Sequence, residues 1–241
     1  MKAFFIIGKY YLCYLKNMKN KFSLILLTFL VVLQVSCQQV DPKKNKTNTN
    51  NIAPLEVVSS DGFKRAYFAS GCFWCVEAIY ESVKGVKESI SGYSGGHTKN
   101  PTYESSNTGK TGHAEAVEII YDPKKISFKL LVDIYFGSQN ISQVNGQGND
   151  IGSQYRSIIF YQNQIEKNII VDKIKVLQKE NPERKIAAEV MPFQKFWIAE
   201  KYHQNYERLH PNNSYIQNVS IPRLKKFQNK FPELLKENSR H

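Results

Sequence analysis

Two cysteines three positions apart, Cys72 and Cys75, lie between a segment with strand periodicity and a segment with helix periodicity. Residues 66–70 alternate in the way that predicts a β-strand. After the cysteines, apolar residues recur at helical spacing from Val76 to Val83. Cys72 is therefore expected at the first turn of a helix, where unpaired backbone N–H groups and the helix dipole favour an anion. We expect the pKa of the Cys72 thiol to fall and its reactivity near neutral pH to rise.

The alternative for this pair is a purely structural role. The glycine before the pair and the two aromatic residues between its members make that alternative the weaker interpretation. The other two cysteines of the chain, Cys13 and Cys37, lie far upstream, and the four together do not form the spacing pattern of a disulfide framework.

Charge and composition limit the possible functions. The chain has 241 residues, is 41% hydrophobic and carries a net charge of +12. Five of its lysines precede Cys37 in a stretch without acidic residues, which leaves +7 for the rest of the chain. Positive and negative charges are mixed along the rest, which is typical of a solvated basic surface. We therefore expect no binding to nucleic acid.

The first 37 residues have the order of an export signal. Residues 1–21 are basic, residues 22–35 are almost wholly apolar, and Ser36 precedes Cys37. The apolar run is shorter than the ~20 residues that a membrane span needs. Its end resembles the lipobox of bacterial lipoproteins, in which Cys37 would be lipidated, although Gln34 departs from that motif. An uncleaved anchor and simple secretion are the alternatives, and Met18 offers a second candidate start.

These features predict an exported protein of the cell envelope, either lipid-anchored at Cys37 or periplasmic, with no other contact with a membrane. Residues 38–60 are polar and rich in Lys, Asn and Thr. Such a segment buries too little apolar surface to offset its ordering entropy, so we expect a disordered tether. Residues 61–241 then form a single catalytic domain with a C-terminal helix.

Within that domain, strands and helices are expected to alternate, which is typical of an α/β or α+β fold. The long polar loop at 137–153 is expected to be functional. The expected strands are 66–70, 86–93, 111–121, 155–161 and 186–190. A short helix is expected within 197–210. Longer helices are expected after Cys72, after Ser127, at 164–179 and at 221–235, the last with a break near Pro232.

Glu115 shares one face of the strand at 111–121 with Val117 and Ile119. A carboxyl group on an apolar face risks burial, and burial favours its neutral form. If this end of the strand is exposed, Glu115 is merely solvated. The strand pattern alone leaves both possibilities open.

Several motifs together resemble the peptide methionine sulfoxide reductase family, A type, in the family's own order. The resemblance spans about residues 63–206 and implies an α+β fold, a mixed β-sheet with helices packed around it as a ferredoxin-like two-layer sandwich. It also implies reduction of the S epimer of methionine sulfoxide, free or in proteins. The motifs are Gly71-Cys72-Phe73-Trp74, Gly92-Tyr93-Ser94-Gly95-Gly96, Asn100-Pro101-Thr102-Tyr103, Thr111-Gly112-His113-Ala114-Glu115-Ala116-Val117, Tyr121-Asp122-Pro123 and Gly148-Asn149-Asp150-Ile151-Gly152-Ser153-Gln154-Tyr155-Arg156-Ser157.

The resemblance implies a role for each matching residue. Cys72 would attack the sulfoxide sulfur as a thiolate, and Glu115 would be the acid that protonates the oxygen. The hydroxyl groups of Tyr103 and Tyr155 would bind that oxygen, and Asp150 would order the same network through water. From the residues alone, two tyrosines satisfied in the core and an aspartate capping a loop are the simpler interpretation.

Phe73 and Trp74 match the wall that holds the S-methyl group of the substrate, a contact that suits aromatic faces. Attack by Cys72 leaves a sulfenic acid. Where the commonest family pattern has Gly, this chain has Cys75, and no cysteine follows it. We expect Cys75 to form a disulfide with Cys72, which a thioredoxin-like thiol carrier reduces, with no metal or organic cofactor.

Two other classes of protein share part of this pattern. A Cys-x-x-Cys pair between a strand and a helix is also typical of thioredoxin-like dithiol–disulfide oxidoreductases. A binding module could instead use Cys72, Cys75, His97 and His113 as a zinc site, although the histidines lack the paired spacing of a structural finger.

Overall fold

The computed structural model describes residues 52–58 and 61–237. The predicted leader, including Cys37 and Met18, and the first part of the predicted tether lie outside the described residues. No helix among the described residues is long and apolar enough to cross a membrane.

Residues 52–58, which the sequence analysis assigned to the tether, lie against the domain. The backbone N–H of Leu55 donates to the carbonyl of Phe193 at 2.8 Å, and that of Val57 donates to the side chain of Gln162 at 2.8 Å. Both contacts involve residues upstream of residue 61, where the catalytic domain is expected to begin.

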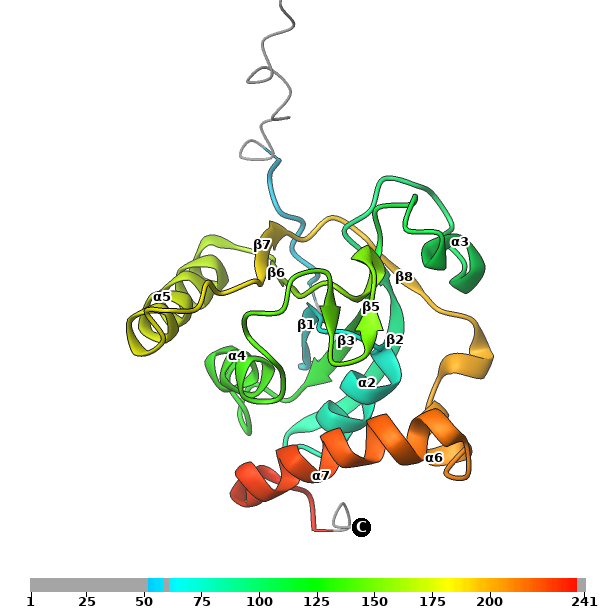
Figure 1. Cartoon of the computed structure of the whole chain (residues 1–241). Coiled ribbons are helices and arrows are strands. Elements are labelled where there is room, and N and C mark those ends of the chain that lie inside the picture. Colours follow the sequence, from blue (N-terminus) through cyan, green and yellow to red (C-terminus); the bar gives the residue numbers. More distant parts are fainter. Residues whose placement is uncertain (1–51, 59–60, 238–241) are drawn as a thin grey trace, which may run out of the picture. The chain divides into compact units, whose positions relative to one another are not determined.

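Six strands form one mixed sheet in the order β7-β6-β1-β3-β2-β8 (Figure 1). Neighbouring strands pair antiparallel except β6 and β7, which run parallel. This arrangement confirms the expected α+β fold with a mixed sheet. The strands are β1 (Lys64–Ala69), β2 (Val86–Ser94), β3 (Ala114–Tyr121), β6 (Ile158–Tyr161), β7 (Glu189–Pro192) and β8 (Phe196–Ile198).

Two of the longer helices, α4 and α5, begin at residues whose side chains cap them. The side chain of Ser127 accepts a hydrogen bond from the backbone N–H of Leu130, and that of Asn163 from Glu166. The helices are α2 (Phe73–Glu81), α3 (Tyr103–Asn107), α4 (Phe128–Gly137), α5 (Gln164–Glu180), α6 (Tyr206–Leu209) and α7 (Ile221–Lys230). Shorter elements are a hairpin of β4 (Gly146–Gln147) and β5 (Asp150–Ile151), the turns η2 (Ser153–Tyr155), η3 (Lys201–His203) and η5 (Pro232–Leu234), and the π-helical turn η4 (Ile216–Ser220).

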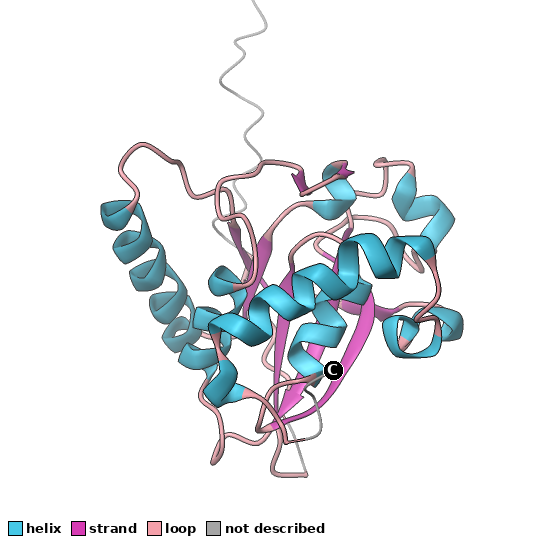
Figure 2. Cartoon of the chain, turned by 60° about the horizontal axis from the view of Figure 1, so that its bottom comes forward, coloured by secondary structure: helices cyan, strands magenta, loops and turns pink. Residues whose placement is uncertain are grey.

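The two faces of the sheet are covered differently. Ala66 and Phe68 of β1 belong to the main core, which includes side chains of α2, α4 and α7. Tyr67 and Ala69, on the other face, belong to a smaller cluster around Phe193. Most of the helices lie in front of the strands in Figure 2. Alternation along β3 places Glu115 on the same face as Val117 and Ile119, beneath α2.

Several expected boundaries differ from those of the structure, and the strand expected at 111–121, for example, begins at Ala114. The strand expected at 155–161 begins only at Ile158, because η2 precedes it and the Arg156 side chain donates to the carbonyls of Ser153 and Gly112. The strand expected at 186–190 is β7, which begins at Glu189. The helix expected within 197–210 is preceded by β8 and η3 and is confined to α6. The predicted break near Pro232 is confirmed, since α7 ends at Lys230.

Candidate active site

Cys72 is the residue immediately before the first turn of α2, as the sequence predicts. Only Ser70 and Gly71 separate it from the end of β1. Gly71 has a φ of +80°, and a Cβ atom there would lie 2.6 Å from the side chain of Gln147. Glycine is therefore required for this connection, both by the backbone conformation and by the close approach of the Gln147 side chain.

The two thiols of the motif form a buried, reduced pair. Cys72 is 6% exposed and Cys75 is 1% exposed. Contrary to the prediction, burial raises the pKa of Cys72 well above its usual value. The pKa of Cys75 instead falls to about 6, because Cys72 donates a hydrogen bond to it and because Arg223, Ser220 and Tyr215 stabilise its thiolate. The helix start alone predicted a lowered pKa for Cys72, but burial outweighs that effect, and the cationic Arg223 lowers the pKa of Cys75 instead.

Glu115 lies directly beside the start of α2. Its side chain is 2% exposed, and its carboxyl accepts a hydrogen bond from the backbone N–H of Phe73 at 3.0 Å. Burial raises the pKa of Glu115 to about 8, against the opposing effect of that hydrogen bond. The structure thus resolves the two alternatives in favour of burial, and the carboxyl is mostly protonated at pH 7.

Tyr103 and Tyr155 approach the same place from two different segments. Tyr103 begins α3, after a capping box formed by Thr102 and Ser105. Tyr155 ends the turn η2. Burial raises the pKa of each tyrosine, and the charges of Glu115 and Cys72 raise it further. Both hydroxyl groups therefore lie within the electrostatic reach of the carboxyl and the thiol.

Asp150 enters the site through a residue that the sequence analysis missed. The Tyr215 hydroxyl donates to an Asp150 carboxylate oxygen at 2.7 Å and lies 3.7 Å from the sulfur of Cys75. The hairpin formed by β4 and β5 carries Asp150 to this position. Tyr215 thus links Asp150 to the cysteine pair.

The aromatic residues of the motif occupy different environments. Phe73 is 1% exposed, and its ring lies 4.9 Å from that of His203 and 6.3 Å from that of Tyr103. Trp74 is half-buried and stacks on Tyr206 with ring centroids 3.9 Å apart. The two side chains could therefore offer aromatic surface beside the cysteine pair.

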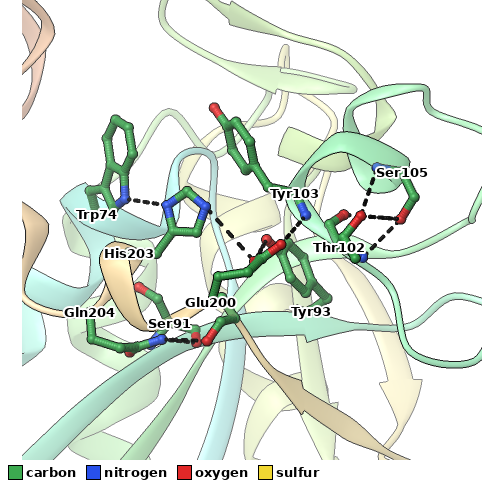
Figure 3. A network of polar contacts seen from close by, with 10 residues as sticks. Trp74, Ser91, Tyr93, Thr102, Tyr103, Ser105, Glu200, His203 and Gln204 are labelled. Carbon is green, nitrogen blue, oxygen red and sulfur yellow. Dashed lines mark hydrogen bonds and ion pairs between the residues drawn. The ribbon is translucent and has the colours of Figure 1, made fainter.

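Residues near the C-terminus fix this aromatic cluster (Figure 3). The Trp74 indole N–H donates to Nδ1 of His203 at 3.1 Å, which places the ring proton of neutral His203 on Nε2, 3.9 Å from Glu200. Glu200 accepts hydrogen bonds from the backbone N–H of Tyr103 and the hydroxyl of Tyr93, each at 2.9 Å. This network joins α2, α3 and β2 around the site.

Arg223 of α7 is a further group that the sequence analysis missed. Its guanidinium donates to the carbonyl and the hydroxyl of Ser70 at 2.9 Å and to the carbonyl of Ser138 at 3.1 Å. Arg223 and Ser70 are 153 positions apart in the chain. A single basic residue in an amphipathic helix carries no local sequence signal for such a contact.

The proposed zinc ligands do not come together. Both ring nitrogens of His113 are bonded within its own loop, one to the backbone N–H of Gly96 at 3.1 Å and the other to the carbonyl of Thr98 at 2.8 Å. In the part of the chain that the structure describes, no group of three or more His, Cys, Asp or Glu side chains could hold a metal ion.

Comparisons with known proteins agree with this arrangement. The family model described as "Peptide methionine sulfoxide reductase" matches residues 64–235. The enzyme named peptide methionine sulfoxide reductase MsrA from Pasteurella multocida is 47% identical over 173 residues, which cover 72% of this chain and 99% of the relative. That from Saccharolobus solfataricus is 43% identical over 171 residues, 71% of this chain and 96% of the relative.

Two solved structures share the fold. Methionine sulfoxide reductase A of Corynebacterium diphtheriae matches with a TM-score of 0.57 and 29% identity, over 67% of this chain and 84% of that protein. Mxr1 from Saccharomyces cerevisiae in its reduced form matches with a TM-score of 0.58 and 29% identity, over 67% of this chain and 93% of that protein. With a matching family model over most of its length and relatives of this identity, the chain belongs to the peptide methionine sulfoxide reductase family, A type.

Proposed function

We propose that this oxidoreductase reduces the S epimer of methionine sulfoxide, free or in proteins, with Cys72 as nucleophile and Glu115 as acid. The observation that carries the proposal is the placement of a protonated, buried carboxyl beside a buried thiol pair at one helix start. Sulfoxide reduction needs a soft nucleophile for sulfur and a proton for oxygen, and these two groups provide both.

In the first step, the thiol proton of Cys72 passes to the Cys75 thiolate, to which it is already hydrogen-bonded. Cys72 then attacks the sulfoxide sulfur and takes over its oxygen, while Glu115 gives its proton to that oxygen. The products are methionine and a Cys72 sulfenic acid, so the substrate sulfur gains the two electrons that the cysteine sulfur loses. In this step Tyr103 and Tyr155, whose pKa values are raised by the charges of Glu115 and Cys72 as well as by burial, donate hydrogen bonds to the oxygen as its negative charge grows.

Phe73 and Trp74 provide the aromatic surface for the S-methyl group of the substrate. Sulfur and methyl groups pack favourably against aromatic rings, and the Trp74 ring is held in place by Tyr206 and His203. Asp150 keeps the Tyr215 hydroxyl beside the thiols.

In the second step, Cys75 attacks the sulfenic acid. An S–S bond forms, the S–O bond breaks, and the hydroxyl leaves as water. One helical turn separates the two cysteines, which suits the ~4.4–6.8 Å Cα separation of a disulfide. Two electrons from a thioredoxin-like dithiol carrier then restore both thiols. The thioredoxin-like alternative for this chain itself is disfavoured, because its thiols are buried beneath the aromatic cluster and lie among acid and tyrosine groups that disulfide exchange does not need.

We further propose export to the cell envelope, with a lipid on Cys37. The support is the basic and apolar order of residues 1–35 followed by Ser36 and Cys37. An exported enzyme cannot use cytosolic thioredoxin directly, so its reductant is an envelope thiol carrier. Cys37→Ala should abolish labelling by a fatty acid and release the protein from the membrane fraction. Unchanged labelling and membrane attachment would contradict the lipid anchor.

Turnover of separated S and R epimers by the wild type and by Cys72→Ser tests the reaction itself. We expect the wild type to reduce the S epimer and Cys72→Ser to have no activity. Cys75→Ser is the matched control, since it should still release one methionine per molecule. Activity that persists in Cys72→Ser, or that prefers the R epimer, would overturn the assignment.

A further inference from the structure

Cys75 interacts with one more polar side chain, which the proposed reaction has not used. Ser220, the last residue of η4, is fully buried and hydrogen-bonds to the sulfur of Cys75. The same hydroxyl also forms a hydrogen bond with the carboxyl of Glu207 in α6. Glu207, Ser220 and Cys75 therefore form a continuous chain of hydrogen bonds.

The proton count of this chain allows two arrangements. A serine hydroxyl has one proton to donate and can accept from another donor. When Cys75 is a thiolate, Ser220 donates to the sulfur and accepts from a protonated Glu207. When Cys75 is a thiol, Ser220 accepts from the sulfur and donates to a Glu207 carboxylate. Moving one proton along each of the two hydrogen bonds converts one arrangement into the other.

The outer end of this chain reaches a cavity. Glu207 is half-buried and lines a cavity of about 520 Å³ between α2, α6 and α7. Burial raises the pKa of Glu207 to about 7, against the Ser220 hydrogen bond, and the charges of Cys75 and Glu81 raise it further. The basic residues Arg208 and Lys225 also line this cavity. A carboxyl with this pKa can both accept and release a proton near neutral pH.

We propose that Ser220 and Glu207 are a proton relay that removes the proton of Cys75 when this thiol attacks the Cys72 sulfenic acid. The inference rests on the proposed function, in which Cys75 resolves that acid. The proton moves from the Cys75 sulfur to Ser220 while the proton of Ser220 moves to Glu207, and Glu207 releases it into the cavity. The departing hydroxyl leaves as water with a proton from Glu115, after solvent has reprotonated that carboxyl.

The relay serves the second step and not the first, because in the first step Cys75 receives a proton from Cys72. The charged and titratable groups that face Cys75 are Cys72, Tyr215, Arg223 and Glu115, and Glu207 through Ser220. Of these, only Glu207 is placed to carry a proton from Cys75 to the cavity. Ser220 contacts the reacting sulfur of Cys75, whereas Glu207 acts on that sulfur through Ser220.

Single-turnover kinetics with the S-sulfoxide of N-acetylmethionine tests the relay in the full-length protein. Methionine release reports the first step, and disulfide formation, followed by quenching and intact mass, reports the second. Glu207→Gln should release methionine at the wild-type rate but form the disulfide roughly 10–100-fold more slowly. Ser220→Ala should slow disulfide formation by at least as much, and because Ser220 also stabilises the Cys75 thiolate, its methionine release is measured separately. The dependence of disulfide formation on pH near 7 should also disappear. Glu81→Gln, which changes another carboxyl of the same cavity, should form the disulfide at close to the wild-type rate and keep its pH dependence, shifted to lower pH because the charge of Glu81 helps to raise the pKa of Glu207.

The outcomes separate the relay from the proposed function. If both relay variants form the disulfide at the wild-type rate and with the wild-type pH profile, the relay is overturned and the proposed function is not. A wild type that releases methionine but forms no disulfide would overturn the role of Cys75 and the relay with it. The methionine burst in each variant shows that it has folded.

Discussion

Glu115 and Cys72 meet because β3 begins beside the start of α2, which brings a carboxyl and a thiol 43 positions apart into one buried site. The sequence placed Glu115 on an apolar face but could not decide whether that face was covered. It also could not reveal that burial would raise the pKa of Cys72 while Arg223 and Tyr215 lowered that of Cys75. The pKa values of the two thiols depend on Ser220 of η4 and Arg223 of α7 as well as on the start of α2.

Replacing Glu115 with Gln should slow methionine release by about 10²–10⁴-fold, because the amide cannot protonate the sulfoxide oxygen. In the wild type, methionine release should fall as pH rises through about 8, since Glu115 loses its proton there. Single-turnover rates between pH 6 and pH 9 measure both effects. A wild-type rate in Glu115→Gln would contradict the role of this residue as the acid.

Tyr215→Phe should raise the pKa of Cys75 above about 6, because the hydroxyl that stabilises its thiolate is lost. The ultraviolet absorbance of the thiolate as a function of pH measures this change. Tyr202→Phe, at a side chain that is 57% exposed, is the matched control and should leave the titration unchanged. Identical titrations for the two variants would show that Tyr215 does not act on Cys75.

At the scale of elements, the periodic segments were predicted well because each has a strong local cause. Ser127 caps α4 and Asn163 caps α5 through their own side chains, and β1 alternates between two apolar faces. The errors in the predicted boundaries include those at 153–157 and 196–203, where side-chain contacts from distant segments determine the backbone conformation. The carboxylate of Glu200, for example, holds the start of α3 and the hydroxyl of Tyr93.

Glu77 illustrates how such contacts hold elements together. It is 2% exposed on α2 and accepts hydrogen bonds from the Ser91 hydroxyl of β2 and the backbone N–H of Asn205. Glu77→Ala leaves these donors without an acceptor and should lower the free energy of unfolding by roughly 2–4 kcal/mol. Urea unfolding measures this loss. Glu88→Ala, at an exposed position of β2, should change it by less than about 0.5 kcal/mol. Equal losses in the two variants would contradict an anchoring role for Glu77.

At the scale of the whole molecule, buried titratable groups make stability depend on pH. Burial raises the pKa values of four carboxyls to about 7 or 8, and it also raises those of Glu81 and Asp150. Above pH 4.5 the folded chain therefore retains protons that the unfolded chain loses, and stability falls as pH rises. Two buried histidines with lowered pKa values and Cys75 act in the opposite direction. The carboxyls are Glu77, Glu166 and Glu207, each with a pKa of about 7, and Glu115, with a pKa of about 8, and the histidines are His113 and His203.

Because the carboxyls outnumber the opposing groups, the free energy of unfolding should decrease between about pH 5.5 and about pH 7.5. Urea unfolding at a series of pH values measures the slope. Glu166→Gln, far from the cysteine pair, should flatten it without changing activity. A stability that rises throughout this range would contradict the protonated state of the buried carboxyls.

The motifs that identified the family lie in the sequence between residues 71 and 157, but the groups that surround Cys75 lie beyond residue 206. The sequence therefore allowed us to propose Cys72 as the nucleophile, Glu115 as the acid, and Tyr103 and Tyr155 as the groups that bind the oxygen. Tyr215, Ser220 and Arg223 could not be predicted, because only the packing of η4 and α7 against α2 brings them to the cysteine pair.

In the proposed reaction, Cys72 takes the sulfoxide oxygen and Cys75 then removes that oxygen from Cys72. Intact mass after one turnover, without reductant, tests it most directly in the wild type and in Cys75→Ser. We predict a wild type that is lighter by two hydrogen atoms, as a Cys72–Cys75 disulfide requires, and a variant that is heavier by one oxygen atom. A wild type that keeps the added oxygen and forms no disulfide, or a variant that thioredoxin recycles at the full rate, would contradict the account.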